Sequence, residues 1–121
     1  HITYGSGRRK TVCASSVLAH FGIYPDTYKY AEKVDDVKRI LRDRGYSVRS
    51  RKSKIVTKKA NTLGSIRSRI KDLNEPGEYF VRVKGHGMVL DGSGKTIVDT
   101  APRKRDRRKV THVYKIEKNY G

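Results

Sequence analysis

The stretch that decides the fold is His86-Gly-Met-Val-Leu-Asp-Gly-Ser-Gly-Lys-Thr-Ile-Val-Asp99. Its two apolar runs flank Gly-Ser-Gly, the pattern of an antiparallel hairpin. A loop of two or four residues would put His86 and Asp99 on one face, directly opposed or diagonally adjacent, whereas a three-residue loop would put them on opposite faces. An aspartate in an apolar strand needs a partner, because burying an unpaired carboxylate is costly. We therefore expect Asp99 to hydrogen-bond to His86.

Cys13 is the only cysteine in the chain, and it precedes an apolar run, Ala14 to Phe21, whose apolar residues recur at helical spacing. With Thr11 as N-cap and Gly22 as stop, this predicts a helix that begins close to Cys13. The unpaired N–H groups of a first helical turn lower the pKa of a thiol and so favour the nucleophilic thiolate. A lone cysteine on an apolar face is also the pattern of a small buried hydrophobe.

The order of Cys13, His86 and Asp99 is that of a cysteine nucleophile, its base and an orienting acid. His20 is a poorer base, because it lies further along the helix of Cys13, about 10 Å away, and we expect it to pack or lie at the surface. Glycines flank His86, and Asp99 is followed by Thr-Ala-Pro.

In this order and spacing, most of the chain resembles the papain-like cysteine peptidases, and most closely the compact branch typified by the double-glycine leader peptidases. The resemblance implies an α+β fold in which an N-terminal helix carrying the cysteine packs against a mainly antiparallel sheet carrying the histidine and the aspartate. It also implies that Cys13 is the nucleophile, that His86 is the general base and acid, and that Asp99 orients the imidazole.

The chain departs from the family at the oxyanion donor. The family commonly carries a glutamine about six residues before the cysteine, whereas this chain has Gly7 there and no glutamine anywhere. The backbone N–H of Cys13, with the side chain of Arg8, Arg9 or Lys10, is the expected substitute. Loss of one oxyanion donor lowers the rate of an enzyme by about a hundredfold or more.

Charge is the second strong signal. The chain has 29 Lys and Arg against 12 Asp and Glu, a formal net charge of +17. This excess predicts an anionic macromolecular partner, with DNA or RNA ahead of a cell-wall polymer. No helix-turn-helix, zinc-finger or RNA-recognition spacing accompanies it, so we expect phosphate contacts without base readout. The candidate nucleic-acid-binding residues are Arg8, Arg9, Lys10, Arg49, Arg51, Lys52, Lys54, Lys58, Lys59, Arg103, Lys104, Arg105, Arg107, Arg108 and Lys109.

The remaining pattern predicts a single domain over residues 1–121. Helices are expected over 34–41 and 63–73, strands over 46–48, 78–84 and 111–117, an exposed strand or loop over 49–61 and a basic loop over 102–109. No spacing suggests a metal site or a cofactor. No apolar run is long enough to span a membrane and no signal-peptide core is visible, which favours a cytoplasmic or virion-associated protein.

The sequence therefore predicts a cysteine peptidase that cleaves a protein or peptide through an acyl-enzyme on Cys13, for instance a viral or phage processing protease acting near nucleic acid. Two alternatives remain open. One is a cell-wall peptidase or amidase, since Gly-His before an apolar strand occurs there too. The other is a non-catalytic nucleic-acid-binding protein that retains the peptidase fold.

Overall fold

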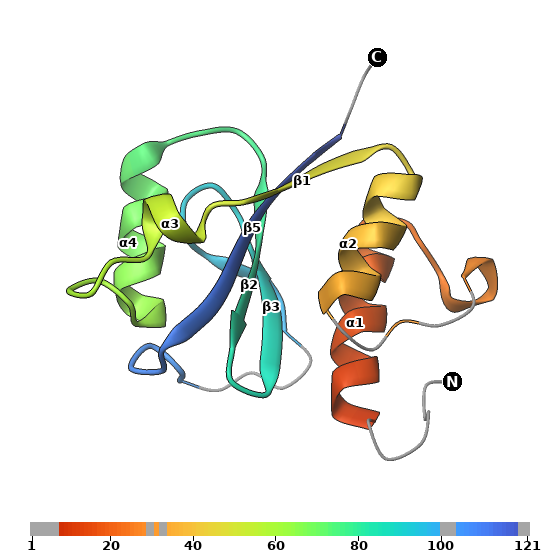
Figure 1. Ribbon diagram of the computed structural model, residues 1–121, viewed down its shortest axis with the longest axis horizontal. Coiled ribbons are helices and arrows are strands. Elements are labelled where there is room, and N and C mark those ends of the chain that lie inside the picture. The colour runs from red at the N-terminus through yellow and green to blue at the C-terminus, as the bar shows by residue number, and fades with distance from the viewer. Residues whose placement is uncertain (1–7, 29–30, 32–33, 100–103, 119–121) are drawn as a thin grey trace.

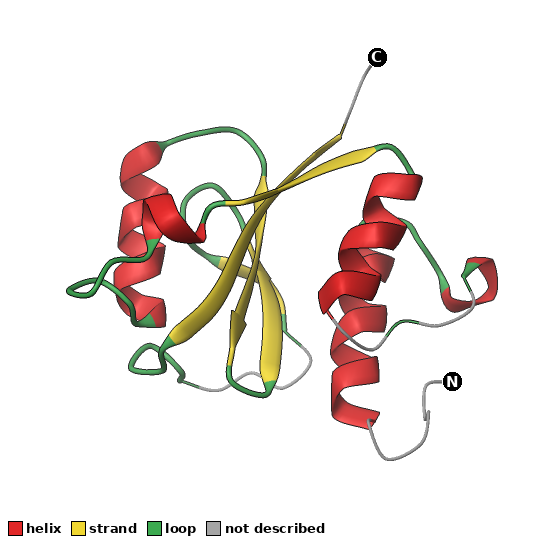
Figure 2. Ribbon diagram, in the orientation of Figure 1, coloured by secondary structure: helices red, strands yellow, loops and turns green. Residues whose placement is uncertain are grey.

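A five-stranded sheet lies between two pairs of helices, giving three layers (Figures 1 and 2). The structure is a computed structural model that describes residues 8–28, 31, 34–99 and 104–118, with side chains from residue 14 onward apart from residue 25. The strands are β1 (Tyr46–Ser50), β2 (Glu78–Val83), β3 (His86–Leu90), β4 (Thr96–Val98) and β5 (Val110–Lys118). Their order in the sheet is β1-β5-β2-β3-β4, and every pairing is antiparallel. The predicted α+β class with a mainly antiparallel sheet is confirmed.

One face of the sheet is covered by α1 (Arg8–His20) and α2 (Val34–Asp43), which are joined by a connection containing the short 3₁₀ helix η2 (Pro25–Thr27). Gly22, two residues after the end of α1, has a φ of 79° in the left-handed region that favours glycine. The apolar core on this face combines Ala14, Val17, Leu18, Ile23, Ala31, Val37, Ile40 and Leu41 with the sheet residues Val48, Phe80, Val89, Tyr114 and Ile116.

The opposite face is covered by α3 (Lys52–Ile55) and α4 (Leu63–Leu73). Thr62 caps the start of α4 by accepting a hydrogen bond from the Ser65 N–H, and Asn74 ends the helix in the left-handed conformation. The second apolar core combines Ile55, Leu63, Ile66 and Ile70 with Tyr79, Val81, Val83, Met88, Leu90, Val110 and Val113. Alternate residues of the strands thus face different cores, as the pleat requires.

Two expectations about local structure are wrong. The segment 49–61 is not a plain strand or loop, because its first residues extend β1 and Lys52–Ile55 form α3. Ile55 is fully buried, and this apolar anchor holds a turn of helix in an otherwise polar, basic segment. Helix α1 begins at Arg8, before the expected N-cap Thr11, so Cys13 is the sixth residue of the helix.

Candidate active site

His86, which is buried, and Asp99, which is half-buried, form a hydrogen-bonded pair. His86 is the first residue of β3 and follows the Lys84–Gly85 turn, while Asp99 directly follows β4. The His86 Nε2 lies 2.6 Å from Asp99 Oδ1, and the two side chains are only 8% and 11% exposed. Such a short contact between a carboxylate and an imidazole is typical of a charge-assisted hydrogen bond, which is strong where water is excluded. The predicted hydrogen bond is confirmed.

The hairpin that brings this pair together differs from the expected one. Leu90 pairs with Thr96, which leaves a three-residue loop between Asp91 and Lys95. The register then shifts so that Val89 pairs with Val98, and Ile97 is an extra residue on β4. A three-residue loop alone would put His86 and Asp99 on opposite faces of the sheet. The bulge cancels this effect, because it moves every later residue of β4 to the other face. Asp99 is therefore diagonal to His86 in the ladder despite the loop length.

The side chain of Asp91 holds this loop. Its Oδ1 accepts hydrogen bonds from the Ser93 N–H (2.9 Å), the Ser93 hydroxyl (2.6 Å) and the Lys95 N–H (3.0 Å). The Ser93 hydroxyl has the largest effect in holding the pKa of Asp91 below its usual value. Gly94 adopts a φ of 84°, and a Cβ there would lie 3.0 Å from the backbone carbonyl carbon of Arg67 and nearer still to its oxygen. The loop geometry thus depends on both a side-chain cap and a glycine.

The helix that carries Cys13 packs against this hairpin. Helix α1 makes its main sheet contacts with β3 and also contacts β4 (Figure 1). The Cys13 side chain itself lies outside the described residues. Because Cys13 is the sixth residue of α1, it lies beyond the first turn, and the expected lowering of its pKa by the helix terminus is not supported. The backbone N–H of an interior helical residue is also engaged with the carbonyl four residues earlier, so this N–H is a poor candidate for the oxyanion donor.

The other described histidines are separate from this pair. His20 lies at the surface, with its Nε2 2.7 Å from Glu78 Oε1, which confirms the surface alternative expected for it. His112 stacks on Tyr114 with ring centroids 5.9 Å apart. Burial lowers the pKa of His112, and the nearby charge of Lys52 adds to the effect. Burial therefore disfavours the charged form of His112.

Sequence reasoning did not single out Gly87. A Cβ at this position would lie 2.9 Å from Phe80 Cε1, so the missing side chain leaves the space that the buried Phe80 ring occupies beside α1. The signal available in the sequence was a glycine inside an apolar strand, which often marks a close approach.

Two of the predicted basic segments lie side by side. The Leu63 N–H donates to the Arg108 carbonyl at 2.9 Å, the Val110 N–H donates to the Asn61 carbonyl at 2.8 Å, and Thr62 forms an isolated β-bridge with Lys109. These bonds bring the loop before α4 against the loop before β5. The candidate basic residues that are exposed are Arg49, Lys52, Lys54, Lys58, Lys59, Lys104, Arg107, Arg108 and Lys109.

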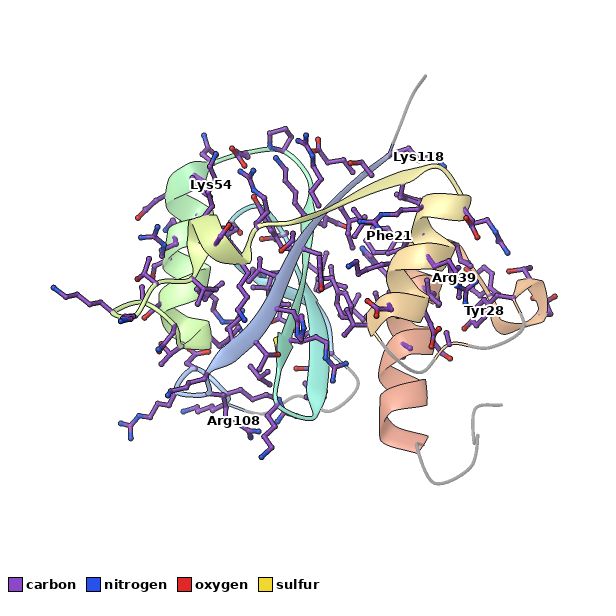
Figure 3. All side chains as sticks on the ribbon, viewed as in Figure 1. Phe21, Tyr28, Arg39, Lys54, Arg108 and Lys118 are labelled. Carbon is purple, nitrogen blue, oxygen red and sulfur yellow. The ribbon has the colours of Figure 1, made fainter. Side chains whose placement is uncertain are left out.

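The other candidate basic residues have different surroundings. Arg51 is half-buried, and its Nη2 lies 3.0 Å from Glu75 Oε1, so this guanidinium serves an internal ion pair. Arg105 is also half-buried. Residues Arg8, Arg9 and Lys10 belong to α1, but their side chains, like the whole of Arg103, lie outside the described residues. Figure 3 shows Lys54 and Arg108 extending from the half of the molecule that holds α3 and α4.

No protein-family model, curated protein or solved structure matches this chain. Among the described residues, no group of three or more His, Cys, Asp or Glu could hold a metal ion. In the same part of the chain, none of the helices is both long and apolar enough to cross a membrane.

Proposed function

We propose that this protein is a cysteine hydrolase of the papain-like kind that cleaves peptide bonds with Cys13 as the nucleophile. The observation that carries the proposal is the part-buried hydrogen bond between His86 and Asp99 on the hairpin that α1 contacts, although the register places both side chains on the Met88 face of the sheet rather than on the Val89 face that α1 covers. An imidazole fixed by a carboxylate and withdrawn from water is the arrangement required of a general base beside a thiol.

The chemistry assigns one role to each side chain. Because Asp99 engages Nε2 of His86, the imidazole would take the thiol proton of Cys13 through Nδ1. The thiolate would then attack the substrate carbonyl carbon, and the imidazolium would return the proton to the leaving amine, which gives an acyl-enzyme. Water would deacylate it, with His86 again acting as base. Since the N–H of Cys13 belongs to the helix, the oxyanion donor is expected among the side chains of Arg8, Arg9 and Lys10.

The first test is thiol alkylation by iodoacetamide as a function of pH. Cys13 is the sole cysteine, so every alkylated molecule reports on it. An ordinary thiol has a pKa of about 8.5, and a thiolate paired with an imidazolium reacts well below that pH. We expect His86→Ala to move the rate profile up to that of an ordinary thiol. The matched control is His20→Ala. His20 lies on the helix that carries Cys13 but pairs with Glu78, so its removal should leave the profile unchanged. An ordinary profile in the wild-type protein would refute an activated nucleophile.

The second test measures turnover. A mixture of peptides incubated with the protein and analysed by mass spectrometry identifies a cleaved bond, and Cys13→Ala should abolish that cleavage. With the substrate found in this way, Asp99→Asn is expected to lower kcat by about 10²- to 10⁴-fold, because the imidazole loses its orienting carboxylate. Unchanged kinetics in Asp99→Asn would remove Asp99 from the mechanism.

We also propose that the protein binds DNA or RNA through the surface formed by the loops 57–61 and 104–109, here called the paired basic loops. Their support is the set of backbone bonds that bring Lys58, Lys59, Arg107, Arg108 and Lys109 into one region of a chain with a net charge of +17. Binding of this kind weakens steeply with salt, because phosphate contacts release counterions. A labelled oligonucleotide followed by fluorescence anisotropy from 50 to about 200 mM salt measures it. Binding that does not respond to salt would contradict the proposal.

The two proposals fail separately. If alkylation follows an ordinary thiol and no peptide is cleaved, while salt-sensitive binding persists, the protein is a nucleic-acid-binding protein with a non-catalytic peptidase-like fold. If peptides derived from cell-wall polymer are the only substrates, the amidase alternative is favoured instead.

A further inference from the structure

A hollow of about 390 Å³ lies between α4 and the β3–β4 loop. It is open to solvent and is lined by Arg67, Ser68, Lys71, Ser93, Gly94, Lys95 and Thr96, whose apolar side-chain stems form much of its surface. It is separate from the His86–Asp99 pair, because neither residue of that pair lines it.

The lining carries three cations. Arg67 is fixed in place, since its Nη1 donates to the Gly94 carbonyl at 2.9 Å and its Nε donates to Asp106 Oδ1 at 3.2 Å. Lys71 and Lys95 are exposed, and within the described part of the chain their ammonium groups make no hydrogen bond or ion pair. Asp106 pairs with Arg67, and the Asp91 carboxylate interacts with the charge of Lys95, so the two carboxylates compensate the three cations only in part. The hollow is therefore positive and presents several N–H and O–H donors, the chemistry that holds a phosphate group.

An ion pair links the hollow to the paired basic loops. Asp106 belongs to the loop before β5, and besides its ion pair with Arg67 it accepts the Gly64 N–H of α4 through its carbonyl at 2.9 Å. Arg67 thus joins the wall of the hollow to that loop. A polyanion lying on the paired basic loops and crossing α4 would meet Lys71 and Lys95 next.

We propose that this hollow binds a phosphate group of a nucleic-acid backbone and so extends the surface of the paired basic loops across α4. The inference rests on the nucleic-acid binding proposed above. A free phosphate compound would offer the same chemistry, and the experiment separates the two sources.

The test compares two double variants that remove equal charge. Lys71→Ala with Lys95→Ala removes two of the three cations that line the hollow. Arg39→Ala with Lys118→Ala removes two exposed cations from the half of the molecule that holds α2 (Figure 3). For a single-stranded oligonucleotide, each phosphate contact contributes about 0.7 to the slope of log affinity against log salt. We expect the first double variant, which loses one phosphate contact, to lower this slope by about 0.7 and the control to lower it much less.

The other outcomes are distinguishable. Equal losses of slope in both double variants would mean that only total charge matters. This result would refute the phosphate site in the hollow and leave nucleic-acid binding intact. If the wild-type protein binds no nucleic acid, the binding proposal itself fails. The second arm of the experiment is a titration with sodium tripolyphosphate, in which the amide NMR signals of Ser93 and Gly94 report binding. Perturbation of these signals, lost in the first double variant, together with an unchanged oligonucleotide slope would assign the hollow to a free phosphate compound and overturn the nucleic-acid assignment.

Discussion

Replacing Gly94 by alanine should destabilise the protein more than an alanine at another glycine of the same backbone conformation. Gly94 has a φ of 84° and its Cβ would meet the backbone of Arg67, with 3.0 Å to the carbonyl carbon and 3.1 Å to Cα. Ordinary contacts of a Cβ begin at 3.4 Å, so the loop and α4 must move apart, most of all to clear the carbonyl oxygen of Arg67, which is the nearest atom. The obstacle is helix backbone rather than a flexible side chain, and it cannot rotate away.

The magnitude has two parts. An L-residue in the left-handed region costs about 1–2 kcal/mol, and overpacking against a fixed neighbour costs about 1–3 kcal/mol. The separation would also weaken the hydrogen bond from Arg67 to the Gly94 carbonyl, which contributes about 1 kcal/mol. We expect Gly94→Ala to lower the free energy of unfolding by about 3 kcal/mol or more.

The matched control is Gly45→Ala, because Gly45 has a φ of 90° and nothing lies within 4 Å of its Cβ position. This variant carries the backbone strain alone and should lose about 1–2 kcal/mol. Urea unfolding of the wild type and the two variants, with the midpoints and slopes compared, measures the difference. Equal losses in the two variants, within about 0.5 kcal/mol, would refute the contact between the hairpin loop and α4 and the loop geometry built on it.

Three further predictions concern single groups. The hydrogen bond from Lys115 holds the pKa of Glu75 below the ordinary value of 4.5. The ionised Glu75 therefore stabilises the protein above that pH, and this stabilisation is lost as the pH falls through the lower pKa of the folded state. The difference in Tm between wild type and Glu75→Gln should be constant near neutrality and vanish in acid, and a difference that grows in acid would contradict this sign. Gly87→Ala forces a Cβ to 2.9 Å from the buried ring of Phe80 and should cost about 1–3 kcal/mol in thermal denaturation, whereas an unchanged Tm would show that the ring can move aside. Thr62→Ala removes the N-cap of α4 and should cost about 1 kcal/mol in urea unfolding, and Thr62→Ser should recover most of it.

The hairpin illustrates how far the sequence reaches. The alternation of apolar residues and the need of Asp99 for a partner were enough to predict its hydrogen bond with His86. The three-residue loop and the bulge at Ile97 were not predictable, because they depend on the cap made by Asp91 and on the fit of Gly94 against Arg67. The latter contact joins distant segments of the chain, and no local pattern reports it.

Helix boundaries and surface sites were harder to predict for the same reason. Helix α4 was predictable from its apolar spacing, whereas α3 is held by the burial of Ile55, which is a tertiary effect. The hollow combines Arg67 and Lys71, four residues apart on one helix, with Lys95 from a remote loop. The first two form a helical pattern that a sequence displays, but only the packed chain brings the third beside them.

The place of β5 in the sheet affects how the polypeptide folds during synthesis. This strand is the last of the five along the chain, yet it lies between β1 and β2 and pairs with both. A nascent chain that has produced β1 to β4 but not β5 lacks the strand that links β1 to the rest, and it presents two open strand edges to other nascent chains. Completion of the sheet therefore follows translation of Val110–Lys118, and until then the two open edges are available for aggregation.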